Sequence, residues 1–306
     1  MGCGLLQRGL LVALALAAMP GGPAVAEGCT PVARAVIALS VEHHSLFVPM
    51  TINRTRATFL LDTGAESTIL SADAAHRLGL AAHYTYSRAM LGFGGAVATG
   101  EVHPDSVAVG SFGMSGFFAL VGAVRLPALE GQPADGLLGG DVLRGFDLDI
   151  DLVGRRLGLY APVACDDPAL PWGGAAHGTP ARVSLARHLV FDVQIAGQTL
   201  PAFIDTGAQA SFIDAAAVAR LGVGEAALRQ DPAVSVRGVG GSAGNAMRQH
   251  RFDRLDVAGG AWIGPVLIVA PLRLPDADVI LGADFLETHR VWFAYEGRRV
   301  FISPQG

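Results

Sequence analysis

The stretch TFLLDTGAESTIL, residues 58–70, decides the fold of this protein. It begins as an apolar run of the kind that forms a buried strand, and the run stops at Asp62, which Thr63 and Gly64 follow at once. Burying one unpaired carboxylate is unfavourable by several kcal/mol. An aspartate directly after a buried strand therefore needs a specific explanation.

The second half of the chain repeats this stretch. In LPAFIDTGAQASFI, residues 200–213, Asp205-Thr206-Gly207-Ala208 lies 143 residues (205 − 62) after Asp62-Thr63-Gly64-Ala65. Other blocks match in the same order: FVPMTIN (47–53) with VFDVQIA (190–196), RLG (77–79) with RLG (220–222), DGLLGGDVL (135–143) with DVILGADFL (278–286), RRLGLY (155–160) with RRVFIS (298–303), and, at a slightly longer offset, FALVGAVRLP (118–127) with VLIVAPLRLP (266–275). Chance does not produce so many matched blocks in one order, so the chain is a tandem duplication.

The repeat is far longer than a solenoid unit, so each copy is read as a lobe with its own core. A stretch rich in proline and glycine, CDDPALPWGGAAHGTP (165–180), is the natural connection between the copies. The predicted organisation is a signal peptide at 1–26, an N-terminal lobe at 27–166, a linker at 167–180 and a C-terminal lobe at 181–306.

Short apolar runs between glycine and aspartate turns predict a mainly β protein with two pseudo-twofold-related, closed barrel-like lobes. One short helix is expected after each aspartate loop. In the first copy Ser71 can cap this helix and Gly79 can end it. In the second copy Asp214 and Gly222 have the same roles.

Composition excludes several classes of function. The chain has 306 residues, of which 51% are hydrophobic, and a formal net charge of −5. This length supports two ordinary domains, and the charge provides no basic surface for nucleic acid or for anionic membranes. No histidine or cysteine cluster has metal-ligand spacing, so no metal or cofactor is expected and all nine histidines are read as surface residues.

The N-terminus has the pattern of an export signal. Arg8 precedes the apolar core GLLVALALAAM (9–19), and small residues at 24–26 allow cleavage before Glu27. The apolar core is too short to span a bilayer comfortably, so a periplasmic or secreted protein without stable membrane insertion is expected. A lipoprotein anchor at Cys29 is disfavoured, because the charge of Glu27 does not suit a lipobox.

Removal of this segment leaves two cysteines, Cys29 and Cys165. In an oxidising compartment they can form a disulfide that ties the N-terminus to the end of the first copy, and they can equally be two unrelated thiols. The sequence leaves both alternatives open.

The duplication explains the aspartates. If the lobes pack about a pseudo-twofold axis, Asp62 and Asp205 face one another and share a proton, because two carboxylates in contact do not both ionise easily. The ionised member can take a proton from water while the protonated member donates to a substrate carbonyl, which hydrolyses an amide without a metal or a covalent intermediate. Gly64 and Gly207 would let the backbone approach the carboxylates, and the hydroxyls of Thr63 and Thr206 could hydrogen-bond across the interface.

These motifs resemble those of the retropepsin-like aspartic proteases with Asp-Thr-Gly-Ala, here duplicated in one polypeptide of the exported bacterial type. The resemblance covers nearly all of the chain after residue 26. In both copies an apolar-apolar-glycine block follows 77 residues after the aspartate (139 − 62 and 282 − 205). In that family this block braces the aspartate loop, which implies such a role for Leu137, Leu138 and Gly139 and for Ile280, Leu281 and Gly282. One chain would supply both aspartates, as in pepsins.

The family also has a glycine-rich hairpin flap over the substrate. The resemblance implies flaps at LGFGG (91–95) and RGVGG (237–241), with substrate-binding residues Gly92, Phe93, Gly94, Gly238, Val239 and Gly240. Neither candidate has the tyrosine of the pepsin pattern. An ordinary surface turn is the alternative for each.

Other features are read as structural. Trp172, Trp262 and Trp292 are expected in core or linker packing. The alternating acids Asp147, Asp149 and Asp151 are expected on a solvated strand face rather than at a calcium site. Glu66 and Gln209 are expected either to contact the substrate backbone or to lie on the surface.

The sequence therefore predicts a monomeric aspartic endopeptidase that takes protein or peptide substrates. Two alternatives stay open, namely a peptide-binding module of the same fold that does not catalyse, and a structural envelope protein rich in β-strands. The cleavage specificity and the removal of a propeptide are not determined by the sequence.

Overall fold

The structure, a computed structural model, describes residues 29–92, 95–173, 176–238, 241–242 and 247–304, together with Met1. The expected signal peptide lies outside these residues, apart from Met1. The described chain is mainly β with short helices. None of the helices in these ranges is long and apolar enough to cross a membrane.

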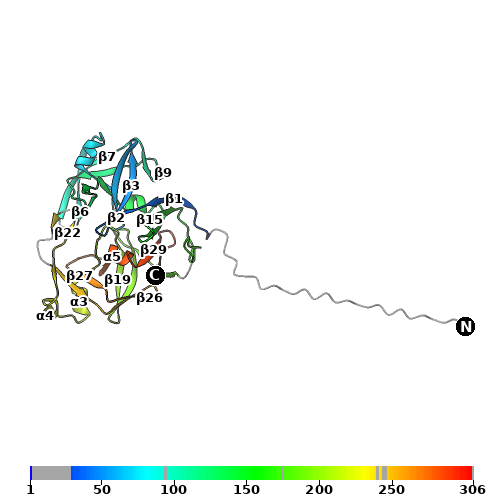
Figure 1. Cartoon of the computed structure of the whole chain (residues 1–306), viewed down its shortest axis with the longest axis vertical. Coiled ribbons are helices and arrows are strands. Elements are labelled where there is room, and N and C mark those ends of the chain that lie inside the picture. The colour runs from blue at the N-terminus through cyan, green and yellow to red at the C-terminus, as the bar shows by residue number, and fades with distance from the viewer. Residues whose placement is uncertain (2–28, 93–94, 174–175, 239–240, 243–246, 305–306) are drawn as a thin grey trace.

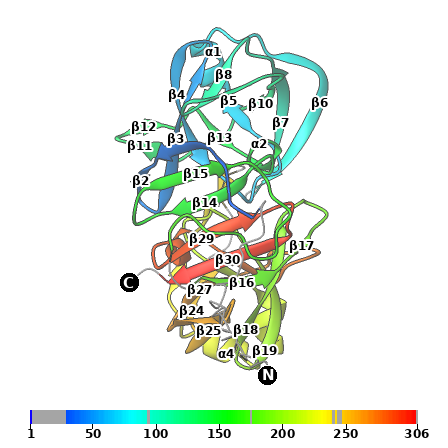
Figure 2. The same ribbon diagram turned by 90° about the vertical axis from the view of Figure 1, so that its right-hand side faces the viewer.

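Among the described residues each half of the chain forms one ten-stranded sheet, and the two sheets have the same strand order. The order is β6-β7-β10-β5-β13-β4-β3-β8-β9 in the N-terminal lobe, with β2 beside β3, and β21-β24-β27-β20-β28-β19-β18-β25-β26 in the C-terminal lobe, with β17 beside β18. Figure 2 shows the N-terminal lobe at the top and the C-terminal lobe at the bottom. The shared order is the structural form of the sequence repeat, and it confirms the mainly β, two-lobed fold.

The strands alternate or run apolar as their sequences predict. In the N-terminal lobe they are β2 (Ser40–Glu42), β3 (Ser45–Ile52), β4 (Thr55–Leu61), β5 (Ile69–Ser71), β6 (His83–Gly92), β7 (Gly95–Val102), β8 (Val107–Val109), β9 (Phe112–Met114), β10 (Ala119–Gly122), β13 (Gly136–Leu138) and the small pair β11 (Ala128–Leu129) and β12 (Gln132–Pro133). In the C-terminal lobe they are β17 (Arg182–Val183), β18 (Leu189–Ile195), β19 (Gln198–Ile204), β20 (Phe212–Asp214), β21 (Ala233–Val234), β24 (Met247–Arg251), β25 (Arg254–Val257), β26 (Gly260–Ile263), β27 (Val266–Ala270), β28 (Val279–Leu281) and the small pair β22 (Arg237–Gly238) and β23 (Gly241–Ser242).

A third sheet joins the lobes. Its order is β1-β15-β14-β29-β30-β16, with bounds β1 (Ala33–Ala38), β14 (Asp147–Asp151), β15 (Arg156–Tyr160), β16 (His177–Pro180), β29 (His289–Ala294) and β30 (Arg299–Pro304). Strand β14 of the first copy pairs antiparallel with β29 of the second. Figure 2 shows β14 and β15 in green beside β29 in red between the lobes, and Figure 1 shows β15 and β29 from another side. One apolar core runs through both lobes and this sheet.

The three aspartates of β14 are buried, so the expected solvated strand face is wrong. Asp147, Asp149 and Asp151 are 0%, 5% and 6% exposed. Arg290 on β29 donates from Nε and Nη2 to the two carboxylate oxygens of Asp149 at 2.8 and 2.6 Å, and it lies 3.3 Å from Asp151. The cation comes from the other copy, 141 residues away in the chain. Only the pairing of the two lobes could reveal it.

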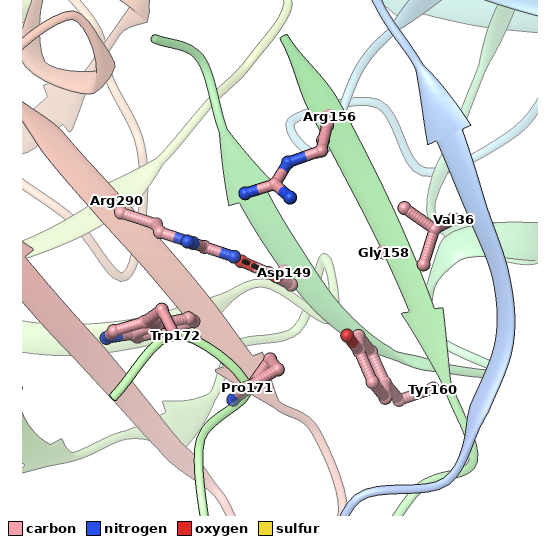
Figure 3. Close-up of a pocket in the computed structure, with 8 residues that line it drawn as sticks. All are labelled: Val36, Asp149, Arg156, Gly158, Tyr160, Pro171, Trp172 and Arg290. Atoms are coloured by element: carbon pink, nitrogen blue, oxygen red, sulfur yellow. Dashed lines mark hydrogen bonds and ion pairs between the residues drawn. The ribbon is translucent and has the colours of Figure 1, made fainter. Parts of the chain in front are cut away.

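Figure 3 shows this ion pair at the edge of a pocket of about 360 Å³. The ring of Trp172, from the segment between the lobes, lies 4.6 Å from the Arg290 guanidinium. Arg156 and Tyr160 line the other side of the pocket. No residue of the two Asp-Thr-Gly loops lines it.

In the described part of the chain five short helices accompany the strands, more than the one expected in each lobe. They are α1 (Ala72–Arg77), α2 (Gly140–Leu143), α3 (Ala215–Arg220), α4 (Glu225–Leu228) and α5 (Ala283–Leu286). The caps of α1 and α3 are as predicted, because Ser71 accepts from the Ala74 N–H and Asp214 accepts from the Ala216 N–H. Single turns such as α2 and α5 are held by tertiary contacts, and hydrophobic periodicity does not reveal them.

Cys29 and Cys165 form a disulfide, which decides between the two alternatives left open by the sequence. It closes a loop of 136 residues and anchors the first described residues of the chain beyond Met1. The segment expected to be a linker is partly ordered as a strand, because β16 pairs with β30. The expected lobe boundaries stay predictions.

Candidate active site

Asp62 and Asp205 occupy equivalent places in the two lobes. Asp62 directly follows β4, whose parallel neighbour is β13, and its N–H donates to the carbonyl of Leu138 at 3.1 Å. Asp205 follows β19, whose parallel neighbour is β28, and its N–H donates to Leu281 at 2.9 Å. The apolar-apolar-glycine blocks therefore lie against the aspartate loops, as the resemblance implied.

The glycine that ends each apolar-apolar-glycine block also hydrogen-bonds to the segment that follows the aspartate loop. The Gly139 N–H donates to Thr68 Oγ1 at 3.0 Å, and Thr68 donates from its own N–H and hydroxyl to Asp141. A Cβ on Gly139 would overlap the backbone of Ser67, so only glycine fits there. The C-terminal lobe repeats this arrangement with Gly282, Ser211 and Asp284.

Four hydrogen bonds lock the two loops to each other. Thr63 Oγ1 accepts from the Thr206 N–H at 3.1 Å and donates to the carbonyl of Ile204 at 2.9 Å. Thr206 Oγ1 accepts from the Thr63 N–H at 3.0 Å and donates to Leu61 at 2.8 Å. Both threonines are buried. The hydroxyls thus satisfy backbone groups of the opposite lobe, which keeps the two aspartates in register.

The loops bring the two carboxyl groups into a hydrogen bond with each other. Each carboxyl also accepts backbone N–H groups of its own loop: Asp62 from Gly64 and Ala65, and Asp205 from Gly207 and Ala208. A Cβ on Gly64 would overlap the Asp205 carboxyl, and a Cβ on Gly207 would overlap that of Asp62. Glycine is therefore required in both loops by the close approach of the opposite carboxyl.

Burial raises the pKa of both carboxyl groups, and the negative charge of Asp205 raises the pKa of Asp62 further. The N–H of Gly207 and the charge of His188 act in the opposite direction on the pKa of Asp205. The shared hydrogen bond raises the pKa of Asp62 and lowers that of Asp205. The two carboxyl groups therefore share one proton and titrate as a pair.

His188 is a site residue that the sequence analysis missed. Its ring stacks on Phe203 with centroids 4.4 Å apart, and its Nε2 donates to the carbonyl of Gly64 at 2.9 Å. A carbonyl only accepts, so the proton of the neutral ring is on Nε2. Burial lowers the pKa of His188, against the charge of Asp205. The expectation that all nine histidines lie on the surface is wrong at His289, which is 6% exposed on β29, and His188 is half-buried.

The repeat itself could have drawn attention to His188, because its equivalent is Ser45. Ser45 is 1% exposed and accepts from Gln209 Nε2 at 2.8 Å, and the same amide donates to the carbonyl of His43. Gln209 thereby contacts the other lobe through its side-chain amide. At these two equivalent positions the contact between the lobes is therefore a neutral Ser45–Gln209 hydrogen bond in one copy and the ionisable His188 ring in the other.

The expected flap positions lie at two antiparallel hairpins. Gly92 ends β6 opposite Gly95 of β7, and Gly238 ends β22 opposite Gly241 of β23. The expected tip residues Phe93, Gly94, Val239 and Gly240 lie outside the described residues. The substrate-binding role of both hairpins stays a prediction.

Within the described ranges, no group of three or more histidine, cysteine, aspartate or glutamate side chains could hold a metal ion. The chemistry at this site is therefore derived from the two carboxyl groups, the N–H groups of their loops and the His188 ring.

The chain matches a family model described as aspartyl protease twice, at residues 48–142 and 191–285. Each match contains one of the two aspartate loops and its brace. By structure the chain is similar to an aspartic proteinase from Irpex lacteus, with a TM-score of 0.55 and 15% identity over 89% of this chain and 97% of that one. This likeness extends across both lobes and shows the fold.

Two curated proteins are similar over one repeat length. The UBA domain-containing protein Mud1 of Schizosaccharomyces pombe is 32% identical over 119 residues, which are 38% of this chain and 33% of that protein. DNA damage-inducible protein 1 of Neurospora crassa is 31% identical over 116 residues, which are 37% of this chain and 25% of that protein. The matched stretch spans a third or less of each relative.

Proposed function

The chain belongs to the aspartyl protease family, and on this premise we propose that it is an endopeptidase that hydrolyses peptide bonds with a water molecule activated between Asp62 and Asp205. The observation that carries this proposal is the hydrogen-bonded pair of buried carboxyl groups at the lobe interface. A pair that shares one proton holds a general base and a general acid side by side.

The asymmetry of the pair supports a division of roles. Asp205, beside His188, would be the base that takes a proton from water as its oxygen bonds to the peptide carbonyl carbon. Asp62 would be the acid that gives its proton to the carbonyl oxygen. When the tetrahedral diol collapses, the C–N bond breaks, the proton now on Asp205 passes to the leaving nitrogen, and a diol hydroxyl returns one to Asp62.

The bracing of the loops supports this role. Both loops are fixed by the threonine hydroxyls and by the glycine blocks before any substrate binds. The carboxyl groups therefore need little reorganisation during reaction, which is the condition for electrostatic preorganisation. The hairpins around Gly92 and Gly238 would cover a bound peptide.

One chain with both aspartates is complete as a monomer. The Cys29–Cys165 disulfide supports export, because such bonds persist in oxidising compartments. We expect the exported protein to begin at Glu27, which mass spectrometry of the N-terminal peptide would check.

Incubation of a peptide library with the wild type and with Asp62→Asn tests the proposal. We expect the wild type to cleave, the variant not to cleave, and pepstatin to inhibit the wild type. Cleavage that survives in Asp62→Asn would refute the mechanism. Peptide binding by the wild type without any cleavage would instead identify a non-catalytic peptide-binding module.

A further inference from the structure

A pocket of about 380 Å³ lies in the N-terminal lobe, between the segment that begins with β9 and the short helix α2. Its apolar lining consists of Phe112, Met114, Phe117, Phe118, Val142 and Phe146. Phe118 is 44% exposed, so the pocket opens to solvent. The dyad does not use this pocket, since neither aspartate lines it.

The internal repeat identifies the kind of group that this pocket accepts. Strand register makes Met114 equivalent to Trp262. Met114 pairs with Val107, which pairs with Ile52 of β3. Trp262 pairs with Leu255, which pairs with Ile195 at the matching place in β18. In the same way Val142 and Phe146 are equivalent to Phe285 and His289.

In the C-terminal lobe an indole covers this place. The ring of Trp262 lies 5.5 Å from that of Phe285 and 6.5 Å from that of His289. In the N-terminal lobe the smaller Met114 and Val142 leave the place open. Phe112 contacts Phe146 edge-on at 5.1 Å, but it comes from a position two residues earlier on the strand.

The lining favours an uncharged aromatic ligand. Four of its side chains are phenylalanines, and the one charged group among them is the Asp141 carboxylate. That carboxylate already accepts hydrogen bonds from Thr68 and from the Val142 N–H. The lining provides no cation for an anionic ligand, and aromatic rings pair well with one another.

The neighbouring backbone favours a polypeptide as the source of that ring. Strand β9 is the last strand of its sheet and pairs only with β8 among the described strands. An edge strand can add an extended peptide through main-chain hydrogen bonds, while an adjacent pocket takes one of its side chains.

We propose that this pocket and the free edge of β9 form a docking site for an extended polypeptide segment that inserts one tryptophan or phenylalanine side chain. The site is separate from the dyad, and the proposal does not depend on hydrolysis. It is linked to the aspartate loop through α2, because the Gly140 N–H donates to the Ala65 carbonyl at 2.9 Å.

The test uses the Asp62→Asn/Asp205→Asn protein, which retains the pocket and does not cut the probe. The probe is an uncharged eight-residue peptide with one central tryptophan, compared with the same peptide carrying alanine there. In NMR titrations we expect the tryptophan peptide to shift the Met114 methyl and the amides of β9, with an affinity roughly tenfold or more above that of the alanine peptide.

Met114→Trp, which copies the C-terminal lobe, should lower the affinity roughly tenfold or more. Phe118→Arg changes an exposed wall of the pocket and should weaken binding even if Met114→Trp fails to fold. Ile263→Trp, which adds an indole at the exposed edge of the other lobe, is the matched control and should bind normally.

Three results would overturn the proposal. They are equal binding of the two peptides, binding unchanged in Phe118→Arg and in folded Met114→Trp, and self-association of the protein through this pocket, which would assign the pocket to a second copy of the chain.

Discussion

Ser45 and His188 occupy equivalent positions in the two lobes, but they make different contacts with the opposite lobe. Ser45 is buried and joins the lobes through a neutral hydrogen bond from Gln209. His188 joins them through the carbonyl of Gly64 and brings an ionisable ring next to Asp205. The duplicated fold thus provides two equal aspartate loops, and the side chains around them make the two aspartates unequal.

The same contrast recurs away from the site. In both lobes an arginine of the short helix pairs with the aspartate before the brace, Arg77 with Asp135 and Arg220 with Asp278. In the joining sheet the equivalent of Asp147 is Arg290, which neutralises two aspartates of the other copy. This arginine–aspartate pair within each lobe kept its residues in both copies, whereas Ser45 and His188, and Asp147 and Arg290, diverged where they contact the other lobe.

The largest expected effect tests whether the unequal lobes still act as one catalytic unit. Asp62→Asn and Asp205→Asn should each lower kcat/KM by about 10⁴-fold or more, and the double variant should lose no more than either single variant. Circular dichroism and thermal unfolding should show an intact fold, since asparagine has nearly the same shape and its side-chain oxygen can still accept the N–H groups of its loop. A single variant with substantial activity would show that one lobe suffices.

The second prediction concerns the cation that one lobe supplies to the other. Arg290→Met should lower the free energy of unfolding by roughly 3–5 kcal/mol at neutral pH, because Asp149 and Asp151 would be left buried without it. Against the effect of burial, the hydrogen bonds from Arg156 and the Gly154 N–H and the charge of Arg290 lower the pKa of Asp151, so the loss should shrink as the pH falls and Asp151 protonates. Denaturant unfolding at several pH values measures both effects.

Arg156→Met is the matched control. Its side chain is 52% exposed and pairs with the same Asp151, so it should lower the free energy of unfolding by only about 1 kcal/mol or less. Equal losses in the two variants would contradict the account of the buried pair.

The third prediction replaces His188 with the residue of the other lobe. His188→Ser should move the acid-side limb of the kcat/KM profile to higher pH, because the ring no longer favours the ionised form of Asp205. It should also lower the free energy of unfolding by roughly 1 kcal/mol through loss of the bond to Gly64.

His188→Gln separates the two effects. Its amide can still donate to the Gly64 carbonyl but carries no charge. The free energy of unfolding should therefore return toward the wild-type value, while the acid-side limb of the kcat/KM profile stays at higher pH. A pH profile identical to that of the wild type in both variants would show that His188 does not affect the ionisation of Asp205.

The smallest expected effect comes from a change that makes the two aspartate loops more like those of pepsins. Ala65 and Ala208 donate only backbone N–H groups to the aspartates, and burial raises the pKa of both carboxyl groups. Activity needs one proton on the pair, so raised values move the active window upward, and a mildly acidic optimum follows. Serine at both positions should lower the acid-side limb by a few tenths of a unit, since added hydroxyl donors favour the ionised form.

The pH dependence of peptide hydrolysis checks this. A wild-type optimum near the strongly acidic pH of pepsins, or an upward shift in the double serine variant, would contradict it.

The sequence by itself determined everything that repeats or that depends on near neighbours. The matched blocks established two equivalent lobes, the buried runs predicted the strands, and Ser71 and Asp214 predicted the starts of α1 and α3. The pairing of Asp62 with Asp205 also followed, because a pseudo-twofold axis near two identical loops brings them together. These inferences need only local pattern and symmetry.

Only the tertiary structure decided the contacts of residues that the two copies do not share. Two of these contacts join residues that are far apart in sequence, namely Arg290 with Asp149 and His188 with Gly64. A third feature depends on residues that differ between the copies, because Trp262 covers a place that Met114 leaves open. Cys29 and Cys165 fall into the same class. A contact between lobes depends on the relative placement of two rigid bodies, and no periodicity within either segment carries that information.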